Sequence, residues 1–251
     1  PAVACVSVCS GAWGSDLARD GCDVCGGDSV ACTRSSSELS GQYTFYGVSE
    51  ERHLLEGISY VFDQHYDGVT RLSADLNVEI QNYSMAIEGL IKLPFNPTAA
   101  MVTDDSVVQL RTTLSVLLEL DASLIEVFNE IDFENRICDF RYVVTTETDV
   151  SARFNTQVFK VQMARNARRA ILLGNPQMAI ESNINIDEGE IEITDVQVAS
   201  TFTVVATVRA ADPAVNTTML SLMSDTALIA VGMNSVDADV TGGRLAVADL
   251  H

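Results

Sequence analysis

Cysteine is the residue type in this sequence best suited to covalent or metal bonds, and it is concentrated at one end of the chain. The 251-residue sequence has six cysteines, five of them within the first 32 residues: Cys5, Cys9, Cys22, Cys25 and Cys32, with Cys138 far downstream. A structural zinc site needs four thiolate or imidazole ligands, often as two C-x2-C pairs. Only Cys22 and Cys25 have that spacing, and no histidine lies nearby. The pattern favours disulfide bonds over a zinc site or free thiols, and we expect no metal and no cofactor.

Five cysteines cannot all pair with one another, so one stays free, bonds to another chain or bonds to Cys138. Residues 137–146 alternate as a strand does, and Cys138 falls on the predicted core-facing side with Phe140, Tyr142 and Val144. A bond to Cys138 would attach the N-terminal segment to the body of the protein. The alternative is that Cys138 is a small buried hydrophobic residue.

Residues 22–32 read CDVCGGDSVAC. This string resembles the C-x-V-C-G-G-D-x-x-x-C knots of extracellular proteins, which are abundant in secreted proteins of algae and other protists. A similar string occurs in the cysteine-rich region of secreted metalloproteases of the thrombospondin-repeat type. The resemblance covers 11 residues and implies an extracellular setting with structural disulfides. It implies no catalytic residue, since the chain has no H-E-x-x-H motif.

Aspartates surround the same cysteines and are candidates for binding calcium through their carboxylate oxygens. They are Asp16, Asp20, Asp23 and Asp28. Their spacing does not match an EF-hand loop. Aspartate and glycine also favour tight turns, so turn formation and calcium binding near Asp20, Asp23 and Asp28 are both compatible with the sequence.

The rest of the chain shows no sequence motif of an enzyme. Histidine, the usual proton carrier near neutral pH, occurs at His53, His65 and His251, and we expect each at the surface. G-x-S-x-G, Walker and G-x-G-x-x-G patterns are absent. We therefore expect no enzymatic activity.

The charge balance limits the partners of the chain. Fifteen basic residues against 35 acidic ones give a net charge of −20, which repels nucleic-acid phosphates and anionic lipids. We expect no nucleic-acid partner and no membrane span, since no apolar run reaches about 20 residues. Sequons beginning at Asn82 and Asn216 predict glycosylation there. Together these features predict an acidic, secreted glycoprotein at the cell surface or outside the cell.

One predicted helix departs from the acidic background. It begins near residue 152 and, with its first turn, carries five basic residues in seventeen positions: Arg153, Lys160, Arg165, Arg168 and Arg169. The last three fall on one side of the helix, at i, i+3 and i+4. Surface ion pairs would explain them. The alternative is an interface with an acidic patch of another copy, a heterologous contact that builds rings or filaments.

Hydrophobic periodicity predicts the fold class. After a serine-rich linker at 33–40, helices are expected to begin near residues 49, 104, 152 and 213, each followed by a strand, with further strands between them. The order is β-α-β-β-α-β twice, which is the arrangement of ferredoxin-like folds.

We therefore predict an α+β protein in three parts. Residues 1–40 are a disulfide-rich arm with its linker. Residues 41–135 and 136–251 are two tandem ferredoxin-like units, each an antiparallel sheet with helices on one face.

The predicted function is structural, because catalytic motifs are absent and the cysteines resemble an extracellular knot. We expect an extracellular protein that self-associates into a filament, hair or surface layer. The alternative is a secreted module of a larger protein that binds carbohydrate or calcium. The expected partners are copies of the chain itself, with other extracellular proteins or glycans as further candidates.

Overall fold

The computed structural model describes residues 35–65, 74–94, 103–132, 134, 137–174, 188–210 and 212–250. The predictions for the N-terminal cysteines, the nearby aspartates and His251 lie outside the described residues. What is described is an α+β protein, as predicted, built on one antiparallel sheet of seven strands. In this part of the chain no single helix is long and apolar enough to cross a membrane, and α7 with α8 would qualify only as a pair bent by 69°.

The strands of the described part are β1 (Ser35–Val48), β2 (Ala74–Lys92), β3 (Ile125–Asp132), β4 (Ile137–Thr146), β5 (Glu192–Ile193), β6 (Gln197–Ala210) and β7 (Asp239–Leu250). The helices are α1 (Glu51–His65), α3 (Asp104–Leu118), α4 (Ser151–Phe154), α5 (Gln157–Gly174), α7 (Pro213–Ser224) and α8 (Thr226–Asn234), with short 3-10 turns at Ala122–Leu124 and Glu188–Glu190. The strand order is β3-β4-β2-β6-β1-β7, and β5 pairs with the end of β2.

The helices begin close to the predicted positions, at Glu51, Asp104, Ser151 and Pro213. Asp212 caps the last of these by accepting a hydrogen bond from the Ala214 amide at 2.9 Å. The helix predicted from residue 152 is divided into α4 and α5, because Asn155 and Thr156 interrupt it.

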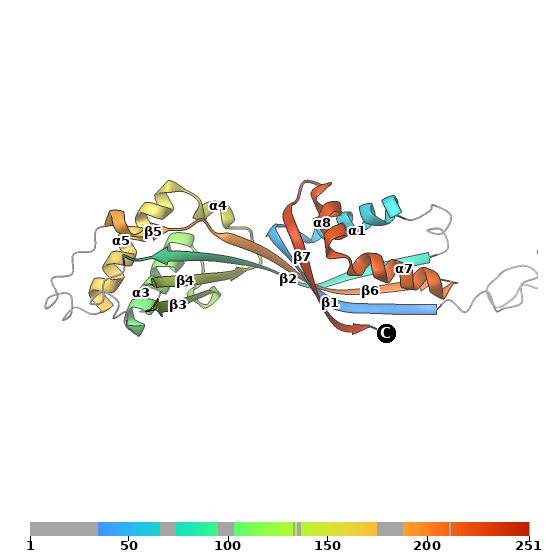
Figure 1. Cartoon of the computed structure of the whole chain (residues 1–251), viewed down its shortest axis with the longest axis horizontal. Coiled ribbons are helices and arrows are strands. Elements are labelled where there is room, and N and C mark those ends of the chain that lie inside the picture. Colours follow the sequence, from blue (N-terminus) through green and yellow to red (C-terminus); the bar gives the residue numbers. More distant parts are fainter. Residues whose placement is uncertain are drawn as a thin grey trace, which may run out of the picture.

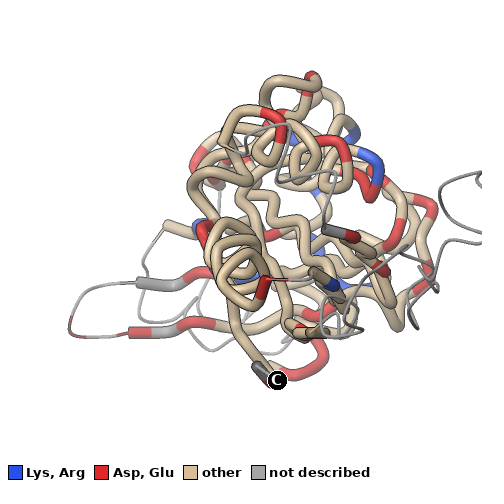
Figure 2. Tube along the Cα trace, turned by 90° about the vertical axis from the view of Figure 1, so that its right-hand side faces the viewer, with Lys and Arg blue, Asp and Glu red and all other residues tan. Residues whose placement is uncertain are grey.

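The molecule is elongated, with two lobes that share the long strands β2 and β6 (Figure 1). We call the described residues within 35–80 and 202–250 the terminal lobe, in which α1, α7 and α8 cover β1, β7 and parts of β2 and β6. The described residues within 84–200 form the inserted lobe, in which α3 and α5 cover β3, β4 and the other parts of the shared strands. Each lobe has its own hydrophobic core. Seen end-on from the terminal lobe, acidic positions are spread over the trace and basic ones are sparse (Figure 2).

The described elements can be grouped into two β-α-β-β-α-β sets, but the sets are nested rather than consecutive, so the predicted tandem arrangement is not confirmed. In the terminal lobe the elements are β1, α1, β2, β6, α7–α8 and β7, and in the inserted lobe they are β2, α3, β3, β4, α5 and β5–β6. Both lobes place their strands in the order second, third, first, fourth. The expected boundary between residues 135 and 136 is corrected, because it divides the hairpin in which β3 pairs with β4.

All the helices lie on one face of the sheet, and an extra residue in β2 makes this possible. The β2–β6 register shifts between Ile80 and Asn82, so that Ile80 pairs with Val204 and Tyr83 pairs with Phe202. Core residues of β2 therefore change from even to odd numbers at Gln81. Because side chains of a strand alternate between faces, the second half of β2 would point its apolar residues away from the helices without this bulge.

The opposite face of the sheet has no covering helix in the described residues and is mostly polar. On the inserted lobe, Arg141 lies over the ring of Phe128, 4.5 Å from the ring centroid. Its guanidinium also pairs with Glu130 at 2.8 Å and Glu88 at 3.7 Å. These contacts place charged side chains of β3, β4 and β2 side by side on the uncovered face.

Helices α1 and α8 cross at two glycines. One side of α1 is buried, including Leu54 and Ile58, whereas Leu55 is exposed. An added Cβ at Gly57 would lie 2.7 Å from the backbone nitrogen of Met233, and one at Gly232 would meet the carbonyl oxygen of Gly57. Glycine is needed at both positions because the two backbones approach too closely for a side chain.

Replacing Gly57 by alanine should destabilise the terminal lobe. Overpacking costs about 1–3 kcal/mol, and the better helix propensity of alanine, worth about 1 kcal/mol, offsets part of that loss. Chemical denaturation should show a lower free energy of unfolding for Gly57→Ala. Ser59→Ala, on the exposed side of the same helix, is the control and should change it by less than about 0.5 kcal/mol. Equal stabilities for both variants would contradict the close crossing.

Candidate functional site

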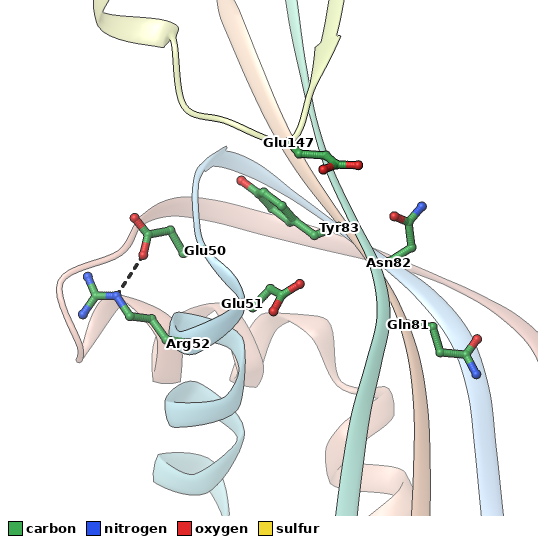
Figure 3. Close-up of a pocket in the computed structure, with 7 residues that line it drawn as sticks. All are labelled: Glu50, Glu51, Arg52, Gln81, Asn82, Tyr83 and Glu147. Atoms are coloured by element: carbon green, nitrogen blue, oxygen red, sulfur yellow. Dashed lines mark hydrogen bonds and ion pairs between the residues drawn. The ribbon is translucent and has the colours of Figure 1, made fainter.

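The two lobes meet at a waist formed by three segments. These are the corner between β1 and α1, the middle of β2, and the loop from β4 to α4 (Figures 1 and 3). Three hydrogen bonds join the β1–α1 corner to β6 and to the middle of β2: the Ser49 amide donates to the Ser200 hydroxyl at 2.9 Å, that hydroxyl donates to the Gly47 carbonyl at 2.9 Å, and the Tyr83 hydroxyl donates to the Ser49 carbonyl at 2.7 Å. Ser49 and Ser200 are fully buried, so these bonds are shielded from water.

The backbone at the β1–α1 corner requires glycine. Gly47 has φ 113°, in the left-handed region, and a Cβ there would collide with the carbonyl of Asp239 in β7. The turn it makes brings Ser49 to Ser200.

Tyr83 is the side chain that joins the two hydrophobic cores. Its ring packs against both clusters and lies 5.1 Å from the ring of Phe202 between centroids. Burial raises the pKa of its phenol; a hydrogen bond with Ser200 works in the opposite direction, and the carboxylates of Asp149, Glu50 and Glu51 add to the rise. The phenol therefore stays protonated and keeps its bond to Ser49.

The first turn of α1 borders the waist and contains a buried histidine. The amide of Glu50 donates to Nδ1 of His53 at 3.1 Å, so the ring proton is assigned to Nε2, which has no partner among the described residues. His53 is 6% exposed, and the expectation of a surface position is wrong for this residue. His65 is exposed, as expected, and its Nδ1 contacts the Val61 carbonyl at 2.9 Å.

Two adjoining hollows of about 500 Å³ each lie beside Tyr83. We call them together the waist groove. Asn82, Tyr83 and Glu147 line both hollows. The first hollow is completed by Glu50, Glu51, Arg52 and Gln81 (Figure 3), and the second by Ser84, Leu124, Thr145, Thr146 and Thr148.

The groove is acidic and rich in hydrogen-bonding groups. Glu50 pairs with Arg52 at 2.9 Å, whereas no ion pair is recorded for Glu51 or Glu147 within the described residues. No group of three or more histidine, cysteine, aspartate or glutamate residues in the described ranges could hold a metal ion. The carboxylates, carboxamides and hydroxyls present can bind a ligand by hydrogen bonds.

At least two of the five predicted interface residues are used within the chain. Arg153 donates to the Leu118 carbonyl and lies 3.8 Å from Glu119. Lys160 pairs with Asp195 at 2.5 Å. The ion-pair interpretation therefore accounts for these two cations. On α5, Arg165 and Arg169 are exposed and Arg168 is half-buried.

The two predicted glycosylation sites lie in different environments. Asn82 is exposed in the waist groove. Asn216 is 1% exposed, and its side-chain nitrogen donates to the carbonyl and the hydroxyl of Ser35, each at 2.9 Å. A glycan on that nitrogen would displace these bonds and has no room in this fold, so the structure argues against Asn216 as an acceptor.

Cys138 lies far from the start of the described chain. Its backbone is in β4 beside Asp139, which pairs with Lys92, whereas Ser35 pairs with Ala210 at the level of Ala74. The 18 steps of β2 between those levels span about 60 Å at roughly 3.3 Å per residue.

That separation limits which disulfides a single chain can form. Cys32 precedes Ser35 by three residues, which reach at most about 10 Å. Cys25 precedes it by ten residues, a reach of about 35 Å. Neither can reach Cys138 of the same chain. The neighbours Phe140, Tyr142 and Val144 are buried, as predicted.

Comparison of the chain with protein-family models, with curated proteins and with solved structures finds no significant match.

The waist groove was not predicted from the sequence. The one sequence feature that points to it is a shift in the apolar alternation at Gln81. Apolar residues stand at even positions in Leu76, Val78 and Ile80 and at odd positions in Tyr83 and Met85. That change predicts two strands separated by a turn, whereas the structure has one strand with a bulge.

Buried tyrosines should make the protein sensitive to alkali. Burial raises the pKa of Tyr43, Tyr83 and Tyr142 above the ordinary value of about 10. The folded state therefore holds these protons more tightly, so the free energy of unfolding keeps this contribution below about pH 10 and loses it as the pH rises further.

An absorbance titration of the phenols, with circular dichroism in parallel, tests this sensitivity. One class of tyrosines should ionise only as the protein unfolds, and Tyr43→Phe, at a buried tyrosine, should reduce the amplitude of that class. Ionisation of every tyrosine in a protein that is still folded would contradict the assignment.

Proposed function

We propose that this chain is an extracellular structural protein rather than an enzyme, and that it self-associates end to end into a filament, hair or surface layer. Its two lobes are, in this proposal, nested ferredoxin-like units. The observation that carries the proposal is the separation of about 60 Å, by strand length, between Cys138 and the residue that follows the cysteine-rich segment.

The two ends of the molecule carry different groups. The cysteine-rich segment precedes Ser35 of the terminal lobe, and the single downstream cysteine, Cys138, is in β4 beside Asp139, which pairs with the last residue of β2 in the inserted lobe. A bond from Cys25 or Cys32 to Cys138 therefore joins two copies. Such a link is heterologous, and in an arrangement that does not close reciprocally within a pair it propagates into a chain of copies.

The sheet also has edges on which a neighbour can add a strand. In the described part, β3 pairs only with β4 and β7 only with β1. Unpaired backbone groups on such strands are templates for pairing with another chain. β7 is bulged at two places and carries glycines, which limits its pairing, whereas β3 has an uninterrupted register of eight residue pairs.

Arginines on α5 supply a further contact for an acidic neighbour. Arg165 and Arg169 are exposed on a chain with a net charge of −20. Charge complementarity of this kind guides encounter and fixes register more than it adds affinity.

Electron microscopy of unreduced and reduced protein tests the proposal, with Cys138→Ala as the decisive variant. Unreduced protein should form regular polymers and covalent ladders on non-reducing gels. Cys138→Ala should lose the ladder, and reductant should loosen the polymers in the same way. Single particles of 27.1 kDa at high concentration would overturn self-association, whereas polymers with an unchanged ladder in Cys138→Ala would overturn only the role of this cysteine.

Reversing Arg165, Arg168 and Arg169 to glutamate should slow assembly if α5 contacts an acidic neighbour. Light scattering should show a lag at least several-fold longer, and the difference should shrink at high salt because screening weakens the contact. Gln157→Glu with Gln162→Glu changes charge on the same helix and is the control. An unchanged lag in the triple variant would remove α5 from the interface.

A further inference from the structure

We propose that the waist groove binds a carbohydrate, held by hydrogen bonds with Gln81, Asn82, Glu51 and Glu147 beside the ring of Tyr83. This site is separate from self-association and does not depend on it. Ligand pockets commonly measure about 300–1,000 Å³, and each of the two hollows, at about 500 Å³, falls in that range.

The groups that line the groove match the chemistry of sugar hydroxyls. Each hydroxyl of a sugar is both a donor and an acceptor, and carboxamides such as those of Gln81 and Asn82 also offer both. Carboxylates accept only, and Glu51 and Glu147 can take the protons of neighbouring hydroxyls. In the second hollow, the hydroxyls of Ser84, Thr145 and Thr148 extend the same polar lining.

A cation fits the groove less well than a neutral ligand. Glu51 projects from α1 on one side of Tyr83, and Glu147 comes from the β4–α4 loop on the other (Figure 3). Calcium requires six to eight oxygens converging on one point. No metal-holding group of acidic, histidine or cysteine side chains occurs among the described residues, so of the two ligand classes expected from the sequence, carbohydrate is the one this groove supports.

The groove is held in shape before any ligand arrives. Tyr83 is fixed by its bond to Ser49 and by its contact with Phe202. The register shift after Ile80 leaves both Gln81 and Asn82 exposed, although neighbouring residues of a regular strand point to opposite faces. A preformed site loses little conformational freedom on binding.

Two sources can supply the sugar. Asn82 begins a sequon within the groove, so a glycan attached to the chain itself can fold into the hollow. A free oligosaccharide can also enter, because the same groups are exposed to solvent. Both sources present the same chemistry, and the experiment separates them.

Full-length protein made without glycosylation is titrated separately with maltotriose, cellotriose, xylotriose and chitotriose, and binding is measured by saturation-transfer NMR. At least one should bind with a dissociation constant of about 1 mM or below. Asn82→Ala and Glu147→Ala should each weaken that binding about tenfold. Asn77→Ala and Glu79→Ala alter exposed residues of the same strand that do not line the groove and should leave it unchanged.

Absence of binding for all four sugars would overturn the proposal. Sugar binding that is unchanged in both Asn82→Ala and Glu147→Ala would also overturn it. So would a protein that binds none of the sugars but binds calcium saturably and loses that calcium binding in Glu147→Ala. A glycosylated preparation then identifies the source. If Asn82 is glycosylated and free sugar binds only after deglycosylation, the attached glycan is the natural ligand. If Asn82 is unmodified and the preparation still binds free sugar, the ligand is a free oligosaccharide.

Discussion

The pairing of β2 with β6 is the constraint on which the rest of the structure depends. The two strands pair along fourteen residue pairs and contribute to both hydrophobic cores. Every other described strand is placed relative to this pair: β1 and then β7 beyond β6, β4 and then β3 beyond β2, and β5 against the end of β2. Because one ladder serves both lobes, the lobes cannot be separated by cutting a single connection. The waist groove exists because β4 covers only the second half of β2.

Local features of the fold could be predicted from the sequence, and the nesting could not. The apolar stripe of α1 and the capped start of α7 at Asp212 depend on neighbours within a few residues, and periodicity reports these. The partner of β2 is decided by packing between residues more than one hundred positions apart, as in the pair of Leu76 with Val208. A chain of alternating strands and helices gives the same pattern whether its units are consecutive or one is inserted into the hairpin of the other.

The site residues show the same division. Asn82 and Asn216 have equivalent sequons, yet one is exposed and the other is enclosed by β1 and its hydrogen bonds to Ser35. His53 resembles a surface residue in a charged stretch, but the crossing of α1 over the sheet buries it. The groove combines side chains from three segments that are distant in sequence, so the local spacing of residues in the sequence does not predict it. Whether a side chain is exposed depends on how the helices pack on the sheet, so local sequence patterns do not predict the exposure of these residues.

The direction of the β2–β6 ladder has a mechanical consequence. If copies are joined through the two ends of the molecule, tension enters near Ser35, crosses the waist and leaves through the far end of β4. Along that path the force runs parallel to β2 and β6, so their hydrogen bonds are loaded in shear and must break together. Strands pulled apart from one end would instead open one bond at a time under a much smaller load. In such an assembly, the continuous sheet would make each copy stiff along its long axis and weak across it.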